Sequence, residues 1–137
     1  MALDTKLVLV LNDTVDPRFA VNAAVVTGLS MGGRLPHLLA EDGKDASGGV
    51  HAGLNPHPVP ILTADPARLR AIHDGAREDD GLTVVGFNEV ALRAREYGAY
   101  LGDLARTPAA DVGYVAVALF GRRGAVNALT NRLPLYR

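Results

Sequence analysis

The sequence predicts an α/β protein with a four-stranded mixed sheet and helices on both faces. Strand-like and helix-like segments alternate along the chain, two helices begin with an Asp-Pro pair, and the apolar residues are mostly Val, Leu and Ala. With 137 residues, of which 48% are hydrophobic and 5% aromatic, the chain has the size of one domain with an aliphatic core. We therefore expect a single α/β domain over residues 1–137.

The first half of the chain predicts two strands and two helices. Residues 6–11 are a continuous apolar run, which indicates a strand that is central and buried on both faces. Asp16 and Pro17 predict the start of a helix that ends near residue 31, before two glycines. Residues 59–63 predict an edge strand, because proline is the second residue, and residues 65–78 predict the second helix. The first helix is expected to bury one stripe of residues: Phe19, Ala23, Val26 and Ser30.

Between these elements, residues 35–60 hold four of the eight prolines and predict little helix. Short edge strands are expected at residues 38–40 and 49–51, on either side of an acidic turn. In the second half, residues 82–87 and 112–120 predict strands. Residues 89–106 predict one helix broken near Gly98 or two short ones, and residues 122–130 predict the last helix.

Composition narrows the classes of function. The formal net charge of −1 disfavours nucleic acid as a partner, because a general nucleic-acid binder carries a basic excess. Cysteine is absent, which excludes disulfides, thiolate metal sites and a cysteine nucleophile. The apolar run near the N-terminus is too short for a signal peptide or a membrane span, so we expect a cytoplasmic protein with no membrane partner.

A candidate anion site lies in the turn Gly121-Arg122-Arg123-Gly124, between the last predicted strand and the last predicted helix. Free backbone N–H groups at the helix start and two guanidinium groups suit an anionic ligand. The alternative is a turn that needs glycine and carries two solvated arginines.

Asn12 and Asp13 follow the first predicted strand, and they share a crevice with this turn if the first and last strands are parallel neighbours. Asp13 is then a candidate general base, or simply a residue that caps backbone groups. Asn22 either contacts the ligand or ties the helix to a loop, and His51 is expected to fold over the crevice. The predicted ligand is a small anion, and no catalytic residue is assigned.

Metal and cofactor sites have weak support in the sequence. His37, His51 and His57 lie near acidic residues, but their spacing matches no metal motif. No phosphate loop, dinucleotide fingerprint or nucleophile elbow is present. His73 is expected on the surface. We predict neither a metal nor a cofactor.

Several segments resemble a family of small bacterial proteins catalogued as domain of unknown function number two thousand. They are Ala-Val-Asn-Ala-Ala at residues 20–24, Gly-Val-His-Ala-Gly-Leu at 49–54, Pro-Val-Pro-Ile-Leu at 58–62 and Val-Asn-Ala-Leu-Thr-Asn-Arg-Leu-Pro-Leu at 126–135. That family resembles the type II peptidyl-tRNA hydrolases, which implies a four-stranded mixed sheet between helices. The hydrolases' Gly-Lys pair has no counterpart before Asn22, where Arg18 and Phe19 stand instead. The resemblance therefore implies the fold and not the activity.

Three functions remain open from the sequence: binding of a small anionic ligand, a divergent hydrolase that uses Asp13 or His51, and a partner-binding module. We also expect a homodimer, because the chain is apolar for its size and residues 35–60 exceed what one small core covers.

Overall fold

The computed structural model describes residues 3–137 and contains one four-stranded mixed sheet. Its order is β4 (Ile61–Ala64), β1 (Thr5–Asn12), β6 (Tyr114–Arg122) and β5 (Thr83–Asn88). β1 runs parallel to β4 and antiparallel to β6, and β5 runs antiparallel to β6. The predicted α/β class, the mixed sheet, the internal position of β1 and the edge position of β4 are confirmed.

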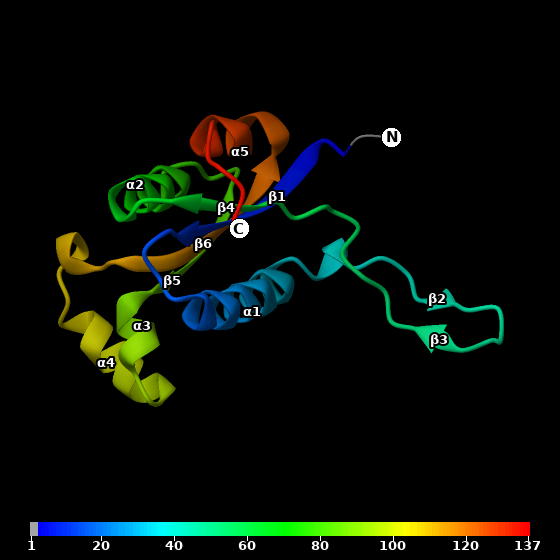
Figure 1. The fold of residues 1–137 in the computed structure, drawn as a ribbon, viewed down its shortest axis with the longest axis horizontal. Coiled ribbons are helices and arrows are strands. Elements are labelled where there is room, and N and C mark those ends of the chain that lie inside the picture. Colours follow the sequence, from blue (N-terminus) through cyan, green and yellow to red (C-terminus); the bar gives the residue numbers. More distant parts are fainter. Residues whose placement is uncertain (1–2) are drawn as a thin grey trace.

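Helices cover both faces of the sheet (Figure 1). α1 (Pro17–Arg34) lies on one face, and α2 (Pro66–Arg77) and α5 (Arg123–Thr130) lie on the other. Alternate residues of β1 face opposite layers, as a strand's two-residue period requires. Val8 and Val10 pack with α2 and α5, whereas Leu9 and Leu11 pack with α1. The structure therefore has two aliphatic cores, one on each side of the sheet.

Both Asp-Pro pairs begin helices, as the sequence predicts. Asp16 accepts a hydrogen bond from the Arg18 amide, and Asp65 accepts one from the Arg68 amide. α1 nevertheless continues through both glycines to Arg34, so the predicted end near residue 31 is wrong. Pro36 is the effective stop signal, because the residue before a proline is disfavoured in helical geometry.

The buried face of α1 also differs from the predicted stripe. The helix buries Ala20, Ala23, Thr27 and Met31, while Phe19 and Val26 are exposed. Apolar residues occur all around this helix, so their spacing does not identify one inner face. The small residues face the sheet because Ala116 and Ala118 of β6 leave room for the helix to approach closely.

Residues 35–60 form a short 3-10 turn, η1 (Pro36–Leu38), and then a hairpin of β2 (Gly43–Lys44) and β3 (Val50–His51) that projects from the body (Figure 1). The strand predicted at residues 38–40 is wrong, and β2 lies within the predicted acidic turn. Asp45 organises that turn by accepting hydrogen bonds from the amides of Ser47 and Gly49. In this turn the carboxylate of Asp45 therefore stabilises the backbone conformation.

Beyond β5, the chain forms two short helices, α3 (Glu89–Arg93) and α4 (Tyr97–Ala105), and a 3-10 turn, η2 (Ala109–Asp111). Glu96 begins α4 by accepting hydrogen bonds from the amides of Gly98 and Ala99. α2 buries His73 against Tyr114, so its predicted surface position is wrong. Within residues 3–137, no helix combines the length and apolarity needed to cross a membrane.

Candidate functional site

The crevice predicted from the sequence does not form, because β1 and β6 are antiparallel. Arg122 is paired with Thr5 at the beginning of β1, whereas Asn12 is the last residue of that strand. The condition for a shared crevice, that the first and last strands are parallel neighbours, is therefore not met. Asn12 and Asp13 lie at one end of β1, and Gly121 and Arg122 lie at the other.

Asn12 is buried and holds its own turn together. Its Nδ2 donates to the Tyr114 carbonyl (2.9 Å), and its Oδ1 accepts from the Thr14 amide (2.9 Å). Asp13 is exposed beside it, and Asn22 is exposed on α1. None of these three side chains meets the arginine turn.

Two of the histidines considered as ligands have structural partners. His51 Nε2 donates to Asp45 Oδ2 in the hairpin (2.9 Å), and this hydrogen bond lowers the pKa of Asp45. His57 is buried, and its Nε2 is hydrogen-bonded to Thr5 Oγ1 (2.8 Å). His51 therefore does not fold over the predicted crevice. Among residues 3–137, no three His, Asp or Glu side chains gather as a metal site requires.

The arginine turn lines a shallow cavity of about 410 Å³. Arg122 contributes to this cavity together with Asp79, whose carboxylate offsets the positive charge. Arg123 instead donates its amide to the Asp4 carbonyl and its Nε to the Leu3 carbonyl (2.9 and 3.2 Å). Gly121 is required for packing, because a side chain there would collide with Leu82. Only Arg122 is left as a candidate anion contact.

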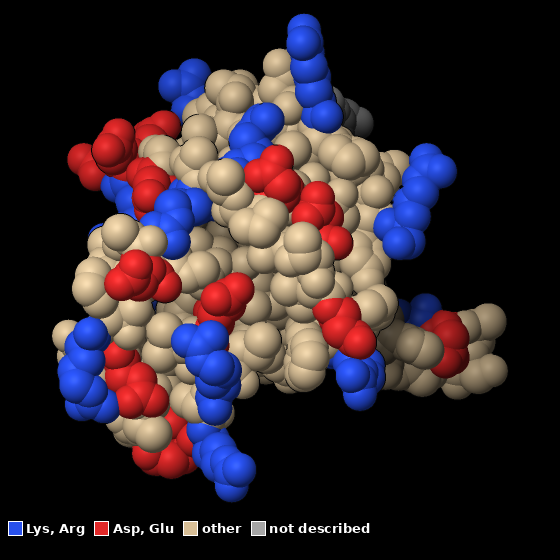
Figure 2. Space-filling model, turned by 60° about the vertical axis from the view of Figure 1, so that its left-hand side comes forward, with Lys and Arg blue, Asp and Glu red and all other residues tan. Residues whose placement is uncertain are grey.

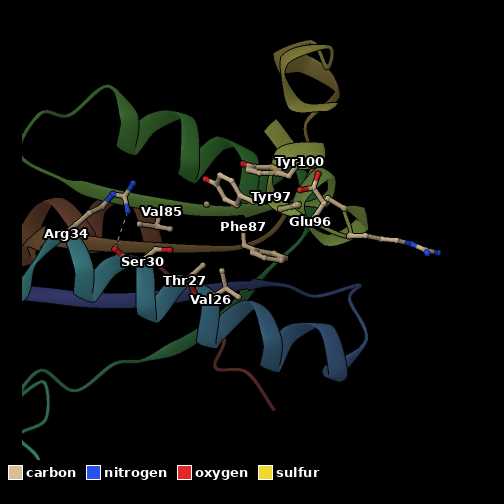
Figure 3. Close-up of a pocket in the computed structure, with 13 residues that line it drawn as sticks. Val26, Thr27, Ser30, Arg34, Val85, Phe87, Glu96, Tyr97 and Tyr100 are labelled. Carbon is tan, nitrogen blue, oxygen red and sulfur yellow. Dashed lines mark hydrogen bonds between the residues drawn. The ribbon is translucent and has the colours of Figure 1, made fainter. Parts of the chain in front are cut away.

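A second cavity, which the sequence analysis missed, lies between α1, β5 and α4 (Figure 3). Its volume is about 420 Å³, and we call it the tyrosine cavity because Tyr97 and Tyr100 form one wall. Val26, Val85 and Phe87 supply an apolar surface, and Arg34 stands at one end. An apolar pocket with a few polar groups is the usual form of a small-molecule site.

The hydroxyl of Tyr100 is positioned by a buried amide. Asn88 Oδ1 accepts from the Ala91 amide (2.9 Å) at the start of α3, and this bond fixes the side chain. Asn88 Nδ2 then donates to the Tyr100 hydroxyl oxygen (3.2 Å). Because that oxygen already accepts a hydrogen bond, the tyrosine's own proton is oriented to donate elsewhere. Tyr97 packs edge-on against Tyr100, with ring centroids 5.4 Å apart.

The charges around the tyrosine cavity favour an anion. Arg34 and Arg95 line it, and Arg34 Nη1 makes a 3.3 Å contact with the Ser30 carbonyl, which leaves other guanidinium donors free. The carboxylate of Glu96 also lines the cavity, but both of its oxygens accept amides of α4. The two guanidinium groups outnumber the single carboxylate, so the lining of the cavity carries a net positive charge.

One local signal could have revealed this site. Tyr97 and Tyr100 are three residues apart, which places them on one face of a helix. Because the first helix was predicted to end near residue 31, the position of Arg34 on α1 was not anticipated. Elsewhere, on the face shown in Figure 2, basic and acidic side chains are interspersed.

The mixed sheet, its two helical layers and the cavity beside β5 define a small α/β protein with a candidate ligand site at the sheet edge. The chain belongs to the family described as protein of unknown function (DUF2000), whose model matches residues 5–137.

One solved structure similar to this chain is a protein of unknown function, Atu0240, from Agrobacterium tumefaciens. The two chains are 21% identical with a TM-score of 0.89, over 99% of this chain and 100% of the other. At this identity the similarity shows the fold alone. No curated protein matches the chain.

Proposed function

We propose that this protein binds a small organic anion with a flat apolar part in the tyrosine cavity. The observation that carries the proposal is the combination of an apolar surface, two tyrosines and a guanidinium group with free donors in one cavity. The flat part of the ligand lies against Val85, Phe87 and the tyrosine rings. Its acidic group faces Arg34, because a guanidinium ion recognises carboxylate and phosphate through paired donors.

Tyr100 gives the site directional specificity. Its hydroxyl proton is free to donate, since Asn88 occupies the oxygen as an acceptor. A ligand that accepts this proton satisfies both the tyrosine hydroxyl and its own lone pair. Replacement of Tyr100 by Phe is therefore expected to weaken binding while keeping the aromatic wall.

A hydrolase activity and a relationship to the type II peptidyl-tRNA hydrolases are two further hypotheses from the sequence, and they have less support than anion binding. A divergent hydrolase would use Asp13 or His51, but neither residue lines the tyrosine cavity and His51 is held by Asp45. Common descent with the type II peptidyl-tRNA hydrolases is supported by the sequence resemblance and agrees with a four-stranded mixed sheet. Binding without catalysis is the function we favour.

The test is thermal unfolding with benzoate, phenyl phosphate and the neutral analogue benzamide. A ligand that binds only the folded state raises its stability, by about 2.7 kcal/mol at a concentration 100 times the Kd. We expect at least one anion to stabilise the protein and benzamide to have much less effect. Arg34→Ala should weaken anion binding about tenfold to a hundredfold, the range for loss of a charged hydrogen bond.

Arg122→Ala is the matched control, because it removes the arginine of the other cavity. We expect this variant to bind the anion as the wild-type protein does. Loss of binding in Arg122→Ala with normal binding in Arg34→Ala would place the site at the arginine turn instead. If neither anion stabilises the wild-type protein at millimolar concentration, the proposal is wrong.

A further inference from the structure

The two edges of the sheet differ in what covers them. At β4, the chain's own C-terminal segment adds to the edge, where the Thr63 amide donates to the Pro134 carbonyl (2.9 Å). The Tyr136 amide donates in turn to the Ile61 carbonyl (2.8 Å). At β5, the opposite edge, β6 is the only strand neighbour among residues 3–137. One edge is therefore closed by a second stretch of backbone, and the other is open.

The outer side of β5 has unused backbone hydrogen-bonding groups. Alternate residues of an edge strand direct their N–H and C=O groups away from the neighbouring strand. Apart from the ladder with β6, no backbone group within residues 3–137 hydrogen-bonds to residues 83–87. Sheet edges are often protected by a charged side chain or a proline, and these five residues include neither. The edge of β5 therefore presents donors and acceptors to a ligand.

The tyrosine cavity lies along this open edge. Val85, Gly86 and Phe87 are three consecutive residues of its wall. Because Gly86 has no side chain, it lines the cavity with its backbone. The wall is completed by α1 on one side and α4 on the other (Figure 3). The edge of β5 is thus set in a groove between two helices.

The shape and the hydrogen-bonding groups of this groove select an extended peptide as the occupant. The unpaired groups of a strand edge are complemented by another extended backbone, which carries donors and acceptors at the same spacing. The sheet of a second copy offers no suitable edge, because its β4 is covered and its β5 lies between α1 and α4. A single peptide strand has no flanking helices and can enter the groove.

Charge sets the direction of the peptide. In Figure 3, Arg34 lies at the Val85 end of the cavity, and Tyr97 lies at the Phe87 end. A guanidinium group binds a carboxylate through paired donors, so the carboxyl terminus of a peptide suits the end that holds Arg34. Because Val85 precedes Phe87 along β5, a peptide placed in this way runs antiparallel to the strand.

We propose that the tyrosine cavity binds the carboxyl-terminal residues of a peptide, which pair with the edge of β5 and place their terminal carboxylate at Arg34. An aromatic side chain of the peptide supplies the flat apolar part of the ligand. The three residues of β5 in the wall span roughly 7 Å, so about three peptide residues face them. This inference rests on the proposed function, since it names the class of ligand for the same cavity.

The terminal carboxylate is tested by calorimetric titration with the acetylated tripeptide Ala-Ala-Phe. We expect the free acid to bind and its carboxamide to bind about tenfold to a hundredfold more weakly, the range for loss of a charged hydrogen bond. Arg34→Ala should remove this difference, whereas Arg122→Ala, which changes the other cavity, should preserve it. Equal binding of the acid and the amide by the wild-type protein overturns the inference.

The backbone pairing is tested by methylating the amide nitrogens of the tripeptide one at a time. In an antiparallel ladder, only alternate residues exchange hydrogen bonds with a given neighbouring strand. We therefore expect methylation at alternate positions to weaken binding by about twofold to tenfold, the range for one neutral hydrogen bond. Methylation at the intervening positions should have a much smaller effect. Equal effects at all three nitrogens contradict pairing with β5.

Titration with benzoate and phenyl phosphate separates this inference from the proposed function. If one of these anions binds and the tripeptide does not bind at millimolar concentration, the cavity holds a small anion, and only the peptide inference is wrong. If neither the anions nor the tripeptide bind, both proposals are wrong. A tripeptide that does not bind to a protein that sediments as a dimer indicates that a second copy covers the edge, which also overturns the inference.

Discussion

His73 and Tyr114 form a stacked pair between α2 and the sheet. Their ring centroids are 4.1 Å apart with an interplanar angle of 26°, and His73 is only 8% exposed. Burial lowers the pKa of His73, and the hydrogen bond from its Nδ1 to Asp74 opposes this effect. Burial also raises the pKa of Tyr114. Both groups are therefore held in their neutral forms at neutral pH.

The lowered pKa of His73 predicts a loss of stability in mild acid. The unfolded chain takes up a proton on this histidine near pH 6.5, whereas the folded chain does so only at lower pH. The free energy of unfolding therefore falls as the pH drops below about 6.5, until the folded histidine is also protonated. Urea unfolding of the wild-type protein and of His73→Phe between pH 8 and 5 measures this contribution of His73 to the free energy of unfolding. An equal loss in both proteins would contradict this origin.

Gly86 of β5 provides the space for the stacked pair. A Cβ atom at this position would lie 2.9 Å from His73 Cδ2 and 2.9 Å from Tyr114 Cε1. Gly86→Ala is therefore expected to lower the free energy of unfolding by about 1–3 kcal/mol, as overpacking does. Gly28→Ala is the control, since no atom lies within 4 Å of a Cβ there. We expect that change in α1 to stabilise the protein by about 0.5–1 kcal/mol.

At the scale of the elements, local sequence signals predict where helices and strands occur, but they do not predict the direction in which each strand runs in the sheet. The Asp-Pro pairs give both helix starts because a cap and a proline act on adjacent residues. Local sequence does not determine the direction of β6, because that direction depends on where the preceding chain returns to the sheet. α3 and α4 have only 5 and 9 residues, and the chain re-enters at the end where β5 left, with Asn88 paired to Tyr114.

The close packing of the inner face of α1 on the sheet predicts that a larger side chain on that face destabilises the protein. Ala23 is fully buried in the core where Ala116 and Ala118 allow close approach of helix and sheet. Ala23→Leu is expected to destabilise the protein by about 1–3 kcal/mol because the helix must move outward. Val25→Leu, on the exposed side, should change the stability by less than about 0.5 kcal/mol. Thermal or chemical unfolding of both variants measures the difference, and equal effects would contradict the assigned inner face.

At the scale of the whole molecule, the candidate site depended on an arrangement that the sequence does not encode locally. The arginine turn and Asn12 were each placed correctly at a strand end, but an antiparallel β1–β6 pair separates them. The tyrosine cavity needs α1 and α4 beside the same strand, although they are more than 60 residues apart in the sequence. Such a juxtaposition arises only from tertiary packing.

The internal position of β6 has a consequence for the order in which the protein is synthesised and folds. β1 and β4 leave the ribosome early and pair with each other, but β5 emerges with no neighbour, since its partner begins only at Tyr114. Until then, the aliphatic sides of β1 and β5 remain open to chaperones or to aggregation. The sheet closes when β6 inserts between β1 and β5, so the four strands come together only after residues 114–122 have left the ribosome.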